Sequence, residues 1–200
     1  PIEVGSATRL AFGRSHSRRA ELLPALELEL SGGRTVSLVG QTELLVRRGA
    51  RMQSVIPVLK KADKSSHYHL RGALDHVVLA AAGLAAAGHE HLIVAGDGPN
   101  RRVEHAPWSQ ADARAYLAEL VGELLDAPHG YLLPFEMLVA ALQGKKLARA
   151  FGDPTEGLGF GPLDRSDGLD VPDDAAAIAR RRLAPLVERM TGDHSLGSSG

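Results

Sequence analysis

The spacing of apolar residues changes near residue 65. Before it, apolar and polar positions alternate at Leu22, Leu26, Leu28 and Leu30, and again over residues 36–61 in the runs VSLVGQ, TELLVRR and MQSVIPVLKK. Alternation with period two is typical of strands with one buried face. The SGG at 31–33 predicts a hairpin turn. We therefore predict a sheet of short strands in residues 1–61.

After Ser65 the apolar positions recur every three or four residues, which predicts a helix over 66–87 that ends near Gly88. The segments HLIVAG (91–96) and RRVEHA (101–106) flank GDGPN, whose turn-forming residues predict a second hairpin. Ser109 is placed to cap a further helix, QADARAYLAELVGELLDA.

Two more helices are expected, one from about Pro134 and one over AAAIARRRLAPLVERM (175–190). Between them, residues 152–174 are rich in Gly and Pro and show no periodicity, which indicates a long loop. The order of elements predicts one α+β domain over 1–191, with an α/β-like mixed sheet flanked by helices. We expect a flexible tail at 192–200.

Composition narrows the chemistry further. The chain has no cysteine, which excludes disulfides and thiolate metal sites and fits a reducing cytoplasm. Residues 1–105 carry 14 Lys/Arg against 10 Asp/Glu, and residues 106–200 carry 9 against 14. The first half is therefore the expected side for an anionic ligand. No apolar run is long enough to span a membrane, and the missing initial methionine leads us to expect a piece of a longer polypeptide.

The stretch 36–61 invites comparison with metal-dependent nucleases, which place two acids and a lysine on a β-meander. A phosphodiesterase of this kind needs at least two carboxylates to hold Mg²⁺. Gly40-Gln41-Thr42-Glu43 stands where Gly-x-x-Asp is expected, and Val58-Leu59-Lys60 where Asp-x-Lys is expected. Glu43 and Lys60 are present, but Val58 replaces the second acid. We predict a nuclease-like meander without catalysis and without a bound metal.

An active nuclease with a rearranged site stays open as an alternative, with Glu43 paired with Glu27 or Asp63. Histidine offers no better metal site. His69 and His76 are two helical turns apart, about 10 Å along the axis, which is too far for one ion. His67 and His69 at a helix start, and His89 and His91 near a turn, are expected at the surface.

Basic residues of the meander are candidate phosphate contacts. Arg47, Arg48 and Arg51 surround a predicted hairpin tip, and Lys60 and Lys61 end the last strand. Arginines and lysines at such positions contact phosphates without reading bases. A solvated turn is the alternative.

Several segments in succession resemble the C-terminal region of RecC, the gamma subunit of the bacterial exodeoxyribonuclease V (RecBCD) helicase–nuclease. They are LRGALDHVVLAAAG (70–83), HAPWSQADARAYLAELVGELLDAP (105–128), LPFE (133–136) and AAAIARRRLAPLVERM (175–190). The polar PVLKKADKSSHYH and the loop at 152–174 depart from that pattern.

The resemblance implies a degenerate restriction-endonuclease-like (PD-(D/E)XK) fold whose metal site is lost. It also implies a role in double-strand break repair and recombination, as a scaffold and a DNA-guiding, strand-splitting module. The expected partners are RecB-like and RecD-like subunits and double- and single-stranded DNA, with no membrane. Mg²⁺ and ATP would be used by the partner subunits. A pure docking module, using 152–174 and the 175–190 helix, is a further alternative.

Overall fold

The computed structural model describes residues 7–14, 19–59, 66–126 and 175–192. Its strands are β1 (Ala7–Phe12), β2 (Ala20–Leu23), β3 (Leu26–Glu29), β4 (Thr35–Leu38), β5 (Gly40–Gln41), β6 (Leu44–Arg48), β7 (Arg51–Val58), β8 (His89–Ala95), β9 (Arg101–His105) and β10 (Met190–Gly192). Its helices are α1 (Ser66–Ala81), α2 (Gln110–Asp126) and α5 (Ala175–Val187).

The main sheet is mixed. Its strands lie in the order β10-β9-β8-β7-β6-β1-β2, and β5 pairs with β1 beside this path. β7 and β8 run parallel, as do β1 and β2, and the other neighbours are antiparallel. A parallel pair needs a crossover, which α1 supplies between β7 and β8. The predicted mixed sheet with helices against it is confirmed.

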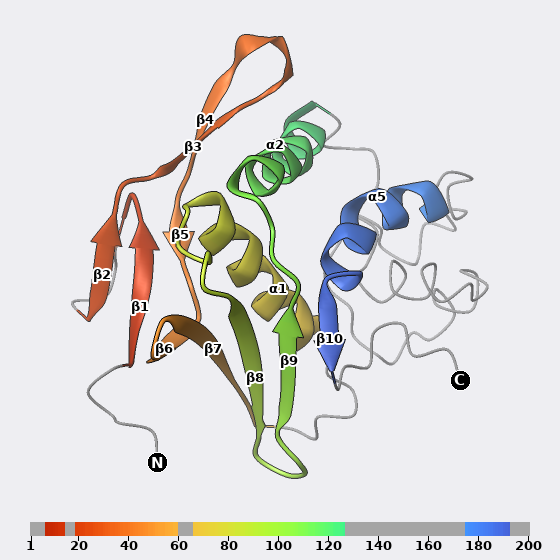
Figure 1. The fold of residues 1–200 in the computed structure, drawn as a ribbon. Coiled ribbons are helices and arrows are strands. Elements are labelled where there is room, and N and C mark those ends of the chain that lie inside the picture. Colours follow the sequence, from red (N-terminus) through yellow and green to blue (C-terminus); the bar gives the residue numbers. More distant parts are fainter. Residues whose placement is uncertain (1–6, 15–18, 60–65, 127–174, 193–200) are drawn as a thin grey trace.

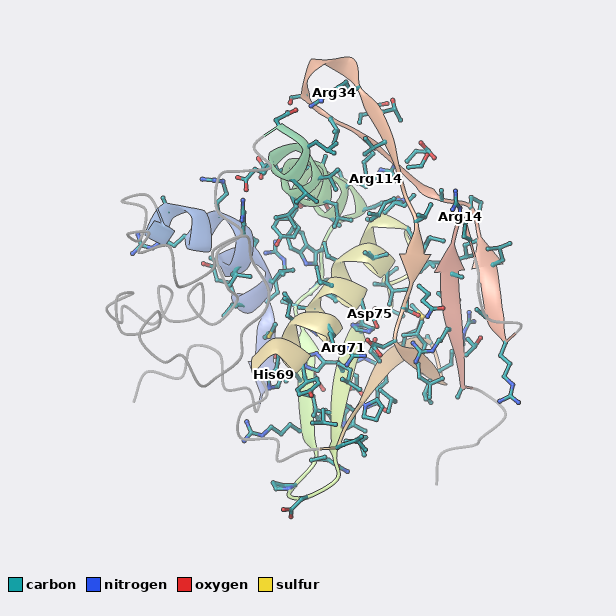
Figure 2. All side chains as sticks on the ribbon, turned by 180° about the vertical axis from the view of Figure 1, so that it is seen from behind. Arg14, Arg34, His69, Arg71, Asp75 and Arg114 are labelled. Carbon is teal, nitrogen blue, oxygen red and sulfur yellow. The ribbon has the colours of Figure 1, made fainter. Side chains whose placement is uncertain are left out.

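The described helices all lie on one side of the main sheet. α1 runs across β7 and β8, and α2 and α5 pack against α1 (Figure 1). Seen from behind, α1 lies in front of the strands (Figure 2). The core between these layers is built from buried residues of β1, β6, β7, α1 and α2, among them Leu10, Leu45, Met52, Val77 and Leu117. The α1 face of the sheet is thus the buried face.

The β3–β4 hairpin extends from the main sheet and packs against α2 (Figure 1). Arg34 donates two hydrogen bonds of 2.7 Å to the Asp126 carboxylate, and Arg114 donates to the carbonyl oxygen of Glu27. Residues 31–33 form the turn, as the SGG sequence predicts.

Two helix ends differ from the prediction. α1 ends at Ala81 instead of near Gly88, because Gly83 adopts a left-handed backbone conformation with φ of 76°. The N–H groups of Gly83 and Leu84 donate hydrogen bonds to the carbonyl oxygens of Ala80 and Leu79, which closes the helix. α5 ends at Val187, and residues 190–192 form β10 on the edge of β9, where a helix end and the start of a tail were expected. Ser109 caps α2 as predicted, since its Oγ accepts the Asp112 N–H at 3.0 Å.

Some predicted elements lie outside the described residues: the helix from Pro134, the loop 152–174 and most of the tail. The single domain over 1–191 therefore stays a prediction. Within the described ranges, no helix has the length and apolar character required to cross a membrane.

The contact between α1 and β8 predicts the effect of adding one methyl group. A Cβ at Gly72 would overlap the ring of His91, whereas a Cβ at Gly122 of α2 would meet no atom within 4 Å. We expect Gly72→Ala to lower the free energy of unfolding by about 1–3 kcal/mol, because overpacking exceeds the gain in helix propensity. Gly122→Ala, the matched control, should raise it by up to about 1 kcal/mol. Chemical denaturation of both variants is the measurement, and a stabilised Gly72→Ala would contradict the close packing.

Candidate functional site

Glu43, the acid that the sequence singled out, lies just before β6 with its side chain 13% exposed. The neighbouring Thr42 is buried, and its Oγ accepts the Leu10 N–H at 3.1 Å. The same hydroxyl donates to the carbonyl oxygen of Glu43 at 2.8 Å. These bonds hold the chain against β1 at the point where Glu43 faces α1.

Two arginines compensate the carboxylate of Glu43. Arg71 of α1 contacts Oε1 through Nε at 2.6 Å and Nη2 at 2.5 Å. Arg9 of β1 places Nη1 3.9 Å from Oε2 and donates to the Thr42 carbonyl oxygen at 2.7 Å. Charge-assisted bonds to guanidinium satisfy a carboxylate without a metal ion. The acid expected to hold Mg²⁺ is thus already paired.

Asp75 lies one turn after Arg71 on α1 and contacts the same segment (Figure 2). It is 7% exposed, accepts the Glu43 N–H at 3.1 Å and accepts the Ser54 hydroxyl at 2.5 Å. The pKa of Asp75 is raised to about 7, mainly by burial and also by the charge of Glu43. The hydrogen bonds from Ser54 and Glu43 and the charge of Arg9 oppose this rise. This carboxyl therefore gains and loses its proton near neutral pH.

Val58 occupies the position of the expected second acid and is 3% exposed. It packs with Ile56 of β7, Ile93 of β8 and Tyr68 of α1. Ser54, Ile56 and Val58 alternate along β7 and all face the helix layer, since strand side chains have period two. Val58 therefore lines an apolar region beneath α1.

The structure describes only some of the basic candidates. Arg47 is exposed on β6, and Arg51 at the start of β7 lies 3.8 Å from Glu104. The side chain of Arg48 and residues Lys60 and Lys61 lie outside the described parts. Phosphate contact by these residues stays a prediction.

Of the acids proposed for a rearranged site, Glu27 does not lie beside Glu43. Glu27 lies on β3, where it accepts the Ser37 hydroxyl at 2.6 Å, and Asp63 lies outside the described residues. Asp75 is the carboxyl that the fold brings to Glu43. The sequence offered only a weak signal that Asp75 contacts Glu43, because 32 positions separate the two residues in the chain.

The expected surface position of His69, His89 and His91 is wrong. Each of these side chains is 0% exposed. β8 starts at His89, directly after the turn at Gly88, so His89 and His91 alternate toward α1 while Glu90 points to the other face. There Glu90 accepts hydrogen bonds from Gln53 and from Arg102.

Five histidines form a connected, buried group, which we name the histidine cluster: His69 and His76 of α1, His89 and His91 of β8, and His105 of β9. His91 bonds through Nε2 to His69 Nδ1 and through Nδ1 to His105 Nε2, both at 2.9 Å. His76 stacks on His105 with ring centroids 4.5 Å apart. His89 Nε2 lies 2.9 Å from Ser54 Oγ, which links the cluster to Asp75.

Burial disfavours the charged form of three of these imidazoles, those of His76, His89 and His105. It lowers the pKa of His76 to about 4, with the bond to the Ala106 carbonyl opposing, and it lowers the pKa of His89 and His105 strongly. Ring nitrogens of His69, His91 and His105 are used to bond one another, and no group of three or more metal-binding side chains is arranged around a common point in the described residues. The cluster is therefore a polar part of the core between α1 and the sheet.

A signal for this cluster was present in the sequence. His69 and His76 are seven residues apart and share a face with Ala73 and Val77, which are buried. Only the pairing of β8 with β9 brings the remaining imidazoles to that face.

Comparisons with known proteins leave the family open. No family model and no curated protein matches this chain. Among solved structures, one described as "Crystal structure of SSO0001" aligns at 12% identity with a TM-score of 0.37. The alignment covers 56% of this chain and half of that one.

The neutral histidines predict an acid-labile fold. Between pH 6.5 and about 4 the unfolded chain binds protons at His76, His89 and His105 that the folded chain excludes, so stability falls as pH drops. Asp75 acts oppositely, because its folded form keeps a proton up to about pH 7 that the unfolded form releases near 4. At pH 5 unfolding should take up about two protons net, and the free energy of unfolding should fall by roughly 2–3 kcal/mol per pH unit.

Urea unfolding at closely spaced pH values between 7 and 4.5 measures this slope. Asp75→Asn removes the opposing group and should steepen it by about half. A free energy of unfolding that does not change between pH 6.5 and 5 would contradict the neutral burial of His76, His89 and His105.

The burial of Val58 predicts that an acid at this position lowers stability and does not create a metal site. Val58→Asp places a charge in the apolar contact with Tyr68 and should cost about 3 kcal/mol or more, or roughly 6–12 °C in Tm. Leu59→Asp is the matched control, because Leu59 is 96% exposed. Thermal melts of both variants are compared with and without millimolar Mg²⁺ or Mn²⁺. A Val58→Asp melt that metal restores to the wild-type Tm would show an intact metal cradle.

Proposed function

We propose that this chain is a non-catalytic, nuclease-like domain of a RecC-like subunit in a RecBCD-type DNA helicase–exonuclease complex. In this proposal it has a degenerate restriction-endonuclease-like fold and serves as a scaffold and a DNA-guiding module. Its work belongs to double-strand break repair in the cytoplasm, beside RecB-like and RecD-like partners. Those partners would use Mg²⁺ and ATP.

One observation carries the proposal: of the two positions expected to hold metal-binding acids, one is an acid already paired with arginines and the other is a buried valine. Glu43 is paired with Arg71 and Arg9, and Val58 is buried among apolar side chains. A divalent ion needs several oxygen ligands, and here one acid is neutralised and the other is missing. The surrounding order of elements, a β6–β7 hairpin followed by α1 and a parallel β8, supports a nuclease-like ancestry.

The resemblance of successive segments to RecC supplies the partners in this proposal. Three of those segments cover most of α1, α2 and α5, which pack together on one side of the sheet. The DNA-guiding part rests on less, namely Arg47 and Arg51 beside the exposed β6–β7 turn.

The first test is incubation of the purified chain with linear double- and single-stranded DNA and Mg²⁺ or Mn²⁺. We expect no degradation. Cleavage that Glu43→Ala abolishes would establish the alternative, a nuclease with a rearranged site, and would overturn the proposal.

The second test concerns DNA binding. The double variant Arg47→Ala with Arg51→Ala should bind a forked duplex more weakly. The slope of log affinity against log salt concentration should also fall by about 1–2, because fewer counterions are released from the DNA when phosphate contacts are lost. Arg34→Ala with Arg180→Ala is the control, because it removes the same charge from the β3–β4 hairpin and α5. Fluorescence anisotropy at several salt concentrations measures both. Binding that is weak and insensitive to salt in the wild type would favour the pure docking module.

A further inference from the structure

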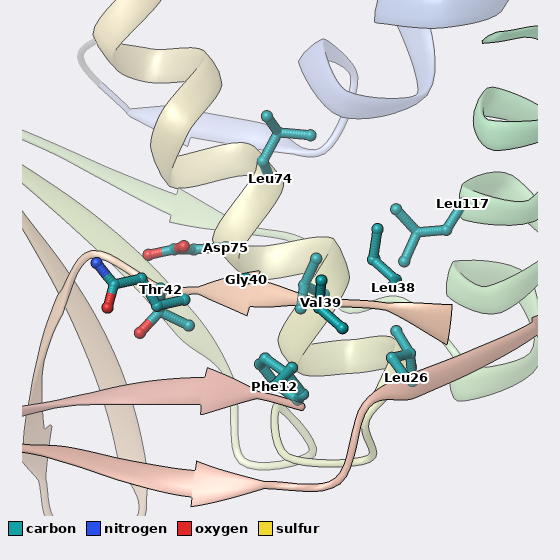
Figure 3. A pocket seen from close by; sticks show the side chains of 11 residues that line it. Phe12, Leu26, Leu38, Val39, Gly40, Thr42, Leu74, Asp75 and Leu117 are labelled. Atoms are coloured by element: carbon teal, nitrogen blue, oxygen red, sulfur yellow. The ribbon is translucent and has the colours of Figure 1, made fainter. Parts of the chain in front are cut away.

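A cavity of about 260 Å³ lies between α1, α2 and the segment that joins β4 to β6 (Figure 3). Its apolar wall is formed by Phe12, Leu26, Leu38, Val39, Leu74, Val78 and Leu117. Val39 is 50% exposed and Leu74 is 38% exposed, so the cavity is open to solvent between β5 and α1. Exposed large apolar side chains around a cavity mark a surface for interaction.

The cavity fits a single large side chain better than a free ligand. Pockets for drug-sized molecules occupy roughly 300–1,000 Å³, which is larger than this space. The polar groups at its end are already used: Thr42 is bonded to Leu10 N and Glu43 O, and Asp75 to Glu43 N and Ser54. A nucleobase would lose water from its polar edges with little replacement, whereas an apolar side chain loses none.

Positive charge lies at the same end of the cavity. Thr42 and Asp75 line it, Glu43 follows Thr42 in the chain, and Arg71 lies one turn before Asp75 on α1 (Figure 2). The side chains of Arg71 and Arg9 are 44% and 36% exposed while both pair with Glu43. Two guanidinium groups face the carboxylate of Glu43, and Asp75 is only partly ionised near neutral pH, so a net positive charge remains. The N–H groups of the arginines that point outward suit a second acid.

We propose that this groove, formed by the cavity and Arg71, binds a segment of a partner subunit that places a large apolar side chain in the cavity and an adjacent acidic residue against Arg71. The proposal rests on the scaffold function proposed above and gives it a location. An apolar anchor seated in a pocket with a charged pair at the rim is the usual composition of a binding hot spot. In this proposal, the face of the fold around Glu43 serves the assembly of subunits.

Two heptapeptides with Gly and Ser ends test the groove directly. One carries Phe between two Glu residues, and the other carries Phe between two Lys residues. Titration into the full isotope-labelled chain, followed by NMR, should shift signals of Val39, Leu74 and Val78 with the acidic peptide, which should bind at least fivefold more tightly than the basic one. Replacing Phe with Ala should abolish the shifts.

Matched variants locate the site. Leu74→Glu places a charge at the opening of the cavity and should weaken the acidic peptide at least tenfold. Leu84→Glu is the control, because Leu84 is 41% exposed and does not line the cavity. Arg71→Gln should remove most of the preference for the acidic peptide. Equal affinity of all peptides, or equal binding by Leu74→Glu and Leu84→Glu, would overturn the proposal.

Partner subunits separate this inference from the function on which it rests. If purified RecB-like or RecD-like subunits bind the wild type and Leu84→Glu but bind Leu74→Glu at least tenfold more weakly, both stand. If they bind all three equally, the groove is refuted and the scaffold function remains. If neither binds the wild type, the scaffold function fails, and the groove as a subunit site fails with it. A dimer of the chain that Leu74→Glu dissociates, or displacement of the peptide by an oligonucleotide, would identify another occupant and overturn the proposal.

Discussion

The close packing of α1 on β7 and β8 is the contact on which the rest of the structure depends. Gly72 lets the helix approach the ring of His91, and Asp75 reaches both Ser54 of β7 and the backbone of Glu43. The parallel pairing of β7 and β8 leaves α1 no other place, because it is the crossover between them. α2 and α5 then pack on α1.

This packing also determines how the charges around Glu43 are balanced. In an active site, a divalent ion offsets the repulsion between neighbouring acids. Here guanidinium groups offset Glu43, burial raises the pKa of Asp75, and a valine takes the remaining position. The acids between β6 and α1 are thus balanced by neighbouring arginines and by burial.

A polar core of this kind makes the helix position specific. The histidine cluster joins α1, β8 and β9 through directed bonds, and a shift of α1 by one residue would break His69 from His91 and Asp75 from Ser54 together. Apolar contacts alone tolerate such shifts more easily. A precisely held α1 in turn determines the position of Arg71 and Leu74 on its outer side.

The sequence by itself determined the alternation of strands over 22–58, the α1 and α2 helices, the turn at 31–33 and the mixed α+β class, because these follow from local periodicity and capping. It also showed that a valine, Val58, stands where a second acid beside Glu43 is expected. Only the tertiary structure decided the partners of Glu43, since Arg9, Arg71 and Asp75 are 28 to 34 residues away and no local pattern links them. The surface position predicted for the histidines was wrong for the same reason, because the burial of His69, His89 and His91 depends on the pairing of β8 with β7 and β9 beneath α1. Imidazole side chains occur both at the surface and in hydrogen-bonded cores, so the position of a histidine in the sequence does not reveal whether it is buried.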